Sequence, residues 1–154
     1  MSRLTAGTPA PDFTLQDQNG ESHHLQSLRG KRVLIYFYPK ASTPGCTTQA
    51  CGLRDIRSEL EARNTLVFGI SPDPVSRLKK FEEKQQLNFT LLSDEDHAVA
   101  DAFGVWGPKK FMGKEFDGIH RISFLVDEQG VIAKVFDDFK TSNHHQVVLD
   151  YLDQ

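Results

Sequence analysis

The chain has 154 residues, which is enough for one domain with a substantial hydrophobic core. Hydrophobic residues make up 38% and charged residues 25% of it, as in ordinary globular proteins. The net charge is -3, and the scattered Lys and Arg residues argue against a nucleic-acid-binding surface. No apolar run approaches the ~20 residues that a membrane-spanning helix needs. We therefore expect a single soluble domain over residues 1–154.

The cysteine content restricts the functional class further. The only two cysteines, Cys46 and Cys51, are too few for a disulfide scaffold. The N-terminal stretch Met1–Gly7 lacks the apolar core of a signal peptide, so we expect a cytoplasmic protein. In a reducing compartment, a close pair of cysteines is more typical of a catalytic, redox-sensing or metal-binding site than of a structural bond.

Strand and helix patterns alternate along the chain. A short strand at 13–15 is followed by an Asn19-Gly20 turn, which predicts a hairpin. Apolar residues at three- and four-residue spacings predict a helix over 45–63. The stretch Val105–Gly118 holds four Gly or Pro residues and is expected to be a long loop. The other expected elements are strands at 32–38, 65–70, 88–92, 121–127 and 131–136, and helices at 75–86, 95–103 and 143–152.

This order of elements predicts an α/β fold. Alternating strands and helices indicate a central, partly parallel sheet with helices on both faces, and the final hairpin makes the sheet mixed. A βαβ unit followed by ββα is the thioredoxin-like order, here with an N-terminal β-hairpin and a central insertion. Cys46 would lie just beyond the carboxyl end of strand 32–38, where ligands bind in open α/β sheets.

Cys46 is predicted to lie in the first turn of a helix. Thr43 is a good N-cap residue, and Pro44 suits the first helical position. Cys46 then lies near unpaired backbone N–H groups and the positive end of the helix dipole. Such an environment lowers a thiol pKa and favours the reactive thiolate. The alternative is a small buried hydrophobe, which is how most single cysteines behave.

Cys51 follows five residues later, and this spacing has a geometric consequence. On one α-helix, with ~1.5 Å rise and ~100° per residue, the two Cα atoms would lie roughly 8.5 Å apart. A disulfide needs Cα atoms within about 7 Å, so the folded helix cannot hold this bond. If the thiols bond, the first turns must unwind, and Gly45 and Gly52 lower the cost of unwinding. The alternative is that Cys51 is an inert core thiol.

Arg121 and Thr43 are further candidates for a thiol site. Arg121 begins a mostly apolar strand, where it is either an ordinary solvated arginine or a group that stabilises a thiolate and binds an oxygen substrate. Thr43 can cap the helix with its hydroxyl, or aim that hydroxyl at a substrate oxygen near Cys46.

A metal site is a weak alternative, because zinc normally needs three or four protein ligands. The pairs His23-His24 and His144-His145 are distant in sequence from the cysteines, and we expect all four to be solvated surface residues. His97 fits the charged start of a short helix. The sequence therefore predicts no metal ion and no cofactor.

The pattern Pro39-x-x-x-Thr43-x-x-Cys46 resembles the active-site signature of the peroxiredoxins. The flanking residues are similar to the subgroup called bacterioferritin comigratory protein, or peroxiredoxin Q, and the likeness covers nearly the whole chain. It includes the segments 36–55, 88–94, 103–107, 118–124 and 135–140.

This resemblance implies a role for each candidate residue. Cys46 would be the peroxidatic cysteine, Cys51 the resolving cysteine, and Pro39 the residue that shields the sulfenic acid. Thr43 and Arg121 would position the peroxide and stabilise the transition state. Many relatives carry Glu three residues after the peroxidatic cysteine, where this chain has Gln49.

The activity implied is that of an antioxidant peroxidase. It would reduce hydrogen peroxide and organic hydroperoxides through a Cys46 sulfenic acid and a Cys46–Cys51 disulfide, with thioredoxin as reductant, and the protein would be a monomer. A disulfide oxidoreductase would normally use Cys-x-x-Cys, not this spacing. A redox sensor or holdase could use the same unwinding helix, and rapid catalytic peroxide consumption would distinguish the enzyme from it.

Overall fold

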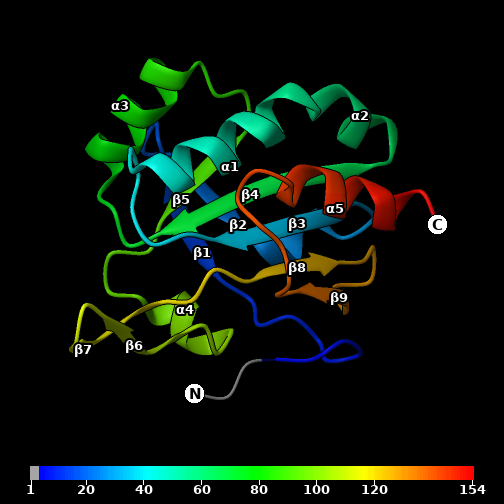
Figure 1. Cartoon of the computed structure of the whole chain (residues 1–154). Coiled ribbons are helices and arrows are strands. Elements are labelled where there is room, and N and C mark those ends of the chain that lie inside the picture. Colours follow the sequence, from blue (N-terminus) through cyan, green and yellow to red (C-terminus); the bar gives the residue numbers. More distant parts are fainter. Residues whose placement is uncertain (1–3) are drawn as a thin grey trace.

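The protein is described by a computed structural model that covers residues 4–154 (Figure 1). Residues 1–3, part of the stretch considered for a signal peptide, lie outside the described residues. Seven strands form one mixed sheet in the order β2-β1-β5-β4-β3-β8-β9. These strands are β1 (Thr14–Asp17), β2 (Ser22–His24), β3 (Arg32–Phe37), β4 (Thr65–Ser71), β5 (Thr90–Ser93), β8 (Ser123–Val126) and β9 (Ile132–Phe136).

Helices cover both faces of this sheet, as expected for the α/β class. Figure 1 shows a layer of helices along one face, and the apolar residues that these helices bury belong to one cluster. They are α1 (Pro44–Asp55), α2 (Arg57–Ala62), α3 (Val75–Gln85) and α5 (His144–Leu152). The other face carries the short helix α4 (Ala98–Ala102) and a second cluster, and a 3-10 turn (Leu25–Leu28) follows β2. None of the helices within residues 4–154 is long and apolar enough to cross a membrane.

Strand β3 runs through the centre of the sheet and leads to the cysteines. It pairs in parallel with β4 and antiparallel with β8, so both of its edges are hydrogen-bonded. Leu34 and Tyr36 pack in the cluster under α1, whereas Val33, Ile35 and Phe37 pack in the opposite cluster. A strand that is buried on both faces needs apolar residues at successive positions, which explains the uninterrupted apolar run in the sequence.

Most of the expected elements are present with small shifts in their ends. The N-terminal hairpin and the hairpin of β8 and β9 are confirmed. The helix expected over 45–63 is divided into α1 and α2 at Ile56. Arg121 precedes β8, which begins at Ser123, and does not begin the strand itself.

The expectation of a long loop over Val105–Gly118 is wrong. This stretch forms a separate antiparallel hairpin of β6 (Trp106–Phe111) and β7 (Lys114–Ile119). The two turn residues, Met112 and Gly113, have φ angles of 51° and 82°, as a tight two-residue hairpin turn requires. The turn is Met-Gly where Asn-Gly is the usual signal, so the sequence pattern did not identify it.

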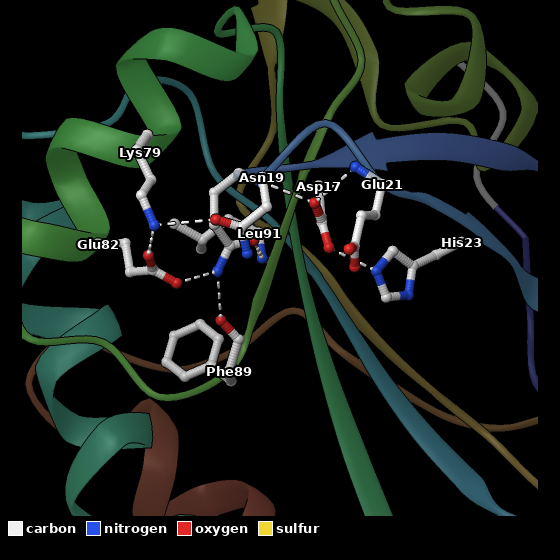
Figure 2. A network of polar contacts seen from close by, with 9 residues as sticks. Asp17, Asn19, Glu21, His23, Lys79, Glu82, Phe89 and Leu91 are labelled. Carbon is white, nitrogen blue, oxygen red and sulfur yellow. Dashed lines mark hydrogen bonds and ion pairs between the residues drawn. The ribbon is translucent and has the colours of Figure 1, made fainter.

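A buried glutamine, Gln18, ties the β1–β2 turn to α3 and β5. Figure 2 shows its partners Glu82, Phe89 and Leu91 in one network of polar contacts. The Nε2 atom of Gln18 donates to the Glu82 carboxylate at 2.5 Å and to the Phe89 carbonyl at 3.1 Å. Its Oε1 atom accepts the backbone N–H of Leu91 at 2.9 Å. These bonds fix the carboxyl-terminal half of α3 against the sheet, and that half of α3 lies beside α1.

The expectation of four surface histidines is wrong for His144. Its side chain is 0% exposed, and its Nε2 atom is hydrogen-bonded to the Ser123 hydroxyl at 2.8 Å. His144, Val148 and Leu152 recur every four residues and form the buried face of α5. This periodicity was present in the sequence and indicates a core position, whereas the adjacent pair of histidines suggested a polar surface.

The buried histidine predicts a pH dependence of stability. Burial, with smaller contributions from His145 and Arg121, lowers the pKa of His144 to about 3, against ~6.5 in an unfolded chain. Between these values the unfolded state binds a proton that the folded state does not, so stability falls as pH falls through this window. The slope from this one group is at most about 1.4 kcal/mol per pH unit.

We expect His144→Gln to reduce the dependence of the free energy of unfolding on pH between pH 6.5 and 4. Urea denaturation at several pH values measures this slope. The matched control is His24→Gln, at an exposed histidine that is hydrogen-bonded to Asp12. This variant should keep the contribution of His144 to the pH dependence of the free energy of unfolding. An unchanged slope in His144→Gln would contradict the prediction.

Candidate active site

The start of α1 presents Cys46 as the sequence predicted. Pro44 is the first helical residue, which makes Cys46 the third, and the Cys46 side chain is 1% exposed. Thr43 occupies the N-cap position but does not cap the helix with its side chain. Its hydroxyl donates to the Lys40 carbonyl at 2.8 Å instead. The first backbone N–H groups of α1 have no partner within the helix. The Thr43 hydroxyl does not accept a hydrogen bond from any of them.

The loop that leads into α1 is anchored to the neighbouring strand. The Asp73 carboxylate, at the carboxyl end of β4, accepts the Ala41 amide at 2.7 Å and the Ser71 hydroxyl at 2.8 Å. Ser42 has a φ angle of 65°, a region that residues other than glycine rarely adopt. A charged, buried acceptor thus fixes the loop conformation that delivers Cys46. Pro39 and Thr43 lie half-buried at the two ends of this loop.

Arg121 meets Cys46 although 75 positions separate them in the chain. Its Nη2 atom lies 3.5 Å from the Cys46 sulfur. The antiparallel pairing of β3 and β8 places Tyr36 opposite Ser123, and the Phe37 amide donates to the Ile122 carbonyl. The segment just before β8 therefore lies at the carboxyl end of β3, beside the start of α1.

Gln49 holds the other half of the Arg121 guanidinium. Its Oε1 atom accepts a hydrogen bond from Arg121 Nη1 at 2.7 Å, and its side chain is 0% exposed. The partner is a neutral amide, so no carboxylate at this position cancels the charge of Arg121. The Arg121 guanidinium thus contacts the Cys46 sulfur with one nitrogen and a neutral amide with the other.

Cys51 lies on the same helix but faces another neighbour. It is half-buried, and its thiol donates to Gln85 Oε1 on α3 at 3.7 Å. Both cysteines are free thiols, and α1 is continuous between them. The structure therefore has the geometry in which a helix separates the two sulfurs, and bonding them requires part of α1 to open.

Helix α5 packs against α1 directly beside Cys51. A methyl group added at Gly52 would lie 2.5 Å from the Nδ1 atom of His145. The imidazole of His145 thus rests on the backbone of α1, where only glycine leaves room. Gly52 has a packing role in addition to the weak helix propensity noted from the sequence.

Lys109 is a residue near the site that the sequence reasoning missed, because its segment was expected to be a loop. It lies on β6, and its ammonium group donates to the Ile119 carbonyl at 2.7 Å, two residues before Arg121. Burial lowers the pKa of Lys109, the positive charge of Arg121 lowers it further, and Cys46 acts in the opposite direction. Within residues 4–154, no group of three or more His, Cys, Asp or Glu residues could hold a metal ion.

The comparisons with known proteins agree with this geometry. Residues 6–135 match the model of the AhpC/TSA family. The chain is 62% identical over 152 residues to peroxiredoxin Bcp of Escherichia coli K12, covering 99% of this chain and 97% of that protein. It is 61% identical over 152 residues to a Haemophilus influenzae protein named putative peroxiredoxin bcp, covering 99% and 98%.

A solved structure of the bacterioferritin comigratory protein of Xanthomonas campestris, studied for its alkyl peroxide reduction activity, superposes with a TM-score of 0.89. It shares 33% identity, and the match covers 96% of this chain and 97% of that one. The chain belongs to the AhpC/TSA family and is a thiol peroxidase of the peroxiredoxin class. Within that class, it falls in the bacterioferritin comigratory protein, or peroxiredoxin Q, subgroup with a thioredoxin-like fold.

The contact between Gly52 and His145 leads to a prediction about stability. Gly→Ala in a helix usually stabilises a protein by up to about 1 kcal/mol, but here the new methyl group overlaps the imidazole. We expect Gly52→Ala to destabilise the protein by about 1–3 kcal/mol. In a His145→Ala background the same change should become neutral or stabilising. Urea denaturation of the four proteins tests this, and stabilisation by Gly52→Ala alone would contradict it.

Proposed function

We propose that Cys46 is the peroxidatic cysteine of this peroxiredoxin and that its substrates are hydrogen peroxide and organic hydroperoxides. The observation that carries the proposal is the 3.5 Å contact between the Arg121 guanidinium and a buried thiol in the first turn of a helix. A cation and a helix N-terminus both favour the thiolate, which is the form that attacks a peroxide.

The first chemical step is a displacement at oxygen. The Cys46 thiolate attacks the terminal oxygen of the peroxide, an S–O bond forms, and the O–O bond breaks. The leaving oxygen takes a proton and departs as water or an alcohol, and Cys46 becomes a sulfenic acid. Arg121 and the first amides of α1 stabilise the charge that develops on the leaving oxygen. The Thr43 oxygen accepts a hydrogen bond from the peroxide, and Pro39 shields the sulfenic acid from solvent.

The second step couples the chemistry to the opening of α1. The Cys51 thiol attacks the sulfur of the sulfenic acid, a disulfide forms and water leaves. Because the folded helix separates the two sulfurs, the turns between them must unwind first. The half-buried position of Cys51 and its long hydrogen bond to Gln85 support this step, since little holds that thiol in place.

The disulfide is then reduced by an external dithiol, for which we propose thioredoxin. Two thiols of thioredoxin are oxidised to a disulfide as Cys46 and Cys51 return to thiols. We further propose that the protein acts in antioxidant defence in the cytoplasm as a monomer, with residues 1–154 as a single catalytic domain that needs no cofactor.

Replacing the attacking thiol tests the central assignment. We expect Cys46→Ser to abolish peroxidase turnover, because a serine hydroxyl is not ionised at neutral pH and is a poor nucleophile. NADPH oxidation coupled through thioredoxin reductase and thioredoxin measures the rate with hydrogen peroxide and with cumene hydroperoxide. Appreciable turnover in this variant would overturn the assignment.

Replacing the second thiol tests the resolving step. After peroxide treatment of Cys51→Ser, mass spectrometry should find Cys46 as a sulfenic acid or in intermolecular species, while the wild type forms the intramolecular disulfide. Thioredoxin-driven turnover should fall in the variant. Undiminished turnover would show that Cys51 is not the main resolving group.

A further inference from the structure

The hairpin of β6 and β7 places a second cation beside the active site. Lys109 pairs with Phe116 across the hairpin, and its stem lies over Gly118, so that a Cβ added there would be 3.2 Å from Lys109 Cδ. Its ammonium group donates to the Ile119 carbonyl at 2.7 Å. Ile119 is the last residue of β7 and is followed closely by Arg121. Lys109 is thus attached to the segment that delivers Arg121 to the sulfur.

Backbone hydrogen bonds make this attachment rigid. The His120 amide donates to the Val105 carbonyl at 2.8 Å, and the His120 ring is 3.0 Å from the Pro108 carbonyl. These bonds hold the residues just before Lys109 against the residue that precedes Arg121. The half-buried position of Lys109 reduces the screening of its charge by water. After burial, which is the largest cause, Arg121 lowers the pKa of Lys109 and Cys46 raises it, so both groups lie within electrostatic range of the Lys109 ammonium.

The titratable groups around this pair of cations do not cancel their charge. Burial raises the pKa of Tyr36 and of Tyr38 well above 10, so both phenols near Cys46 are neutral. Burial, with smaller contributions from His145 and Arg121, lowers the pKa of His144 to about 3, so this imidazole is neutral as well. On β7, Glu115 and Asp117 flank the partner of Lys109, and strand alternation directs them to the opposite side of the ribbon.

We propose that Lys109 is a positioning residue of the peroxide site, whose ammonium group, fixed by the Ile119 carbonyl, supports the Cys46 thiolate together with Arg121. Gln49 belongs to the same arrangement, because a neutral amide on Arg121 leaves both positive charges available to the sulfur. The proposal rests on Cys46 as the attacking thiol. It adds no step to the chemistry, since Lys109 acts on the sulfur through its charge.

The test measures the ionisation of Cys46 without peroxide. In a Cys51→Ser background, Cys46 is the only thiol, and its rate of alkylation by iodoacetamide at pH 4–9 gives the midpoint of its ionisation. We expect Lys109→Gln, which keeps a hydrogen-bond donor for Ile119, to move this midpoint up by about 0.5 pH unit. Below the midpoint, the alkylation rate should fall about threefold, in proportion to the thiolate fraction.

Two further variants separate charge from structure. Lys109→Arg should restore the midpoint, because it keeps the charge, and Lys110→Gln, at the exposed neighbouring lysine, should leave it unchanged. The shift should also shrink as NaCl is raised from 20 to 500 mM. An unchanged midpoint in folded Lys109→Gln would overturn the proposal, and so would an equal shift in Lys110→Gln.

The same measurement stays interpretable if Lys109→Gln folds poorly. In that event Lys109→Met decides, because it removes the charge and keeps the aliphatic stem. The charge model predicts the upward shift expected for Lys109→Gln, and a wild-type midpoint in folded Lys109→Met would overturn the proposal. A separate experiment tests whether Cys46 is the attacking thiol. Peroxidase turnover in Cys46→Ser would show that it is not. The two ideas can therefore fail independently.

Discussion

The proposed chemistry depends on a sulfur that is buried and would have to carry negative charge. At 1% exposure, a Cys46 thiolate could not rely on water, so the protein itself would have to supply the compensating charge and hydrogen-bond donors. Arg121 supplies the charge, the first turn of α1 supplies backbone donors, and Asp73 fixes the loop that aligns the two. The surrounding sheet serves this arrangement, because the pairing of β3 with β8 brings Arg121 to the end of the strand that leads to Cys46.

The helix that carries Cys46 in its first turn also separates it from Cys51. With both thiols free, α1 is held from two sides, by α3 through Gln85 near Cys51 and by α5 through His145 on Gly52. In the proposed mechanism, the reduction of peroxide needs this helix folded, whereas formation of the disulfide needs its first turns open. The rate of disulfide formation in this mechanism therefore depends on how weakly the contacts around Cys51 hold α1. Gly45 and Gly52 lower the free-energy cost of unwinding the helix.

The β6–β7 hairpin gives the site a component that does not touch the central sheet through strand pairing. The segment before β8 is bound to it through the His120 amide, which donates to the Val105 carbonyl, and through the His120 ring on the Pro108 carbonyl, while Lys109 donates to Ile119 at the end of β7. The positive charges of Lys109 and Arg121 repel each other, which lowers the stability of the folded protein. An anion bound near both charges would offset this repulsion. A peroxide site with a neutral Gln49 is thus more positive than one in which a carboxylate balances the arginine.

The sequence alone predicted the strands of the central sheet, most of the helices and the helix start at Pro44, because apolar periodicity, capping residues and glycine turns act over a few neighbouring residues. It missed the β6–β7 hairpin. The resemblance of the Pro39-x-x-x-Thr43-x-x-Cys46 pattern identified the family, and Arg121 was singled out by its place before an apolar strand. Only the tertiary structure decided that Arg121 touches Cys46, that His145 rests on Gly52, and that Lys109 donates to the Ile119 carbonyl at the end of β7. Each of these depends on which strands pair and which helices pack together. Such contacts join residues far apart in the chain, and no local pattern of residues specifies them.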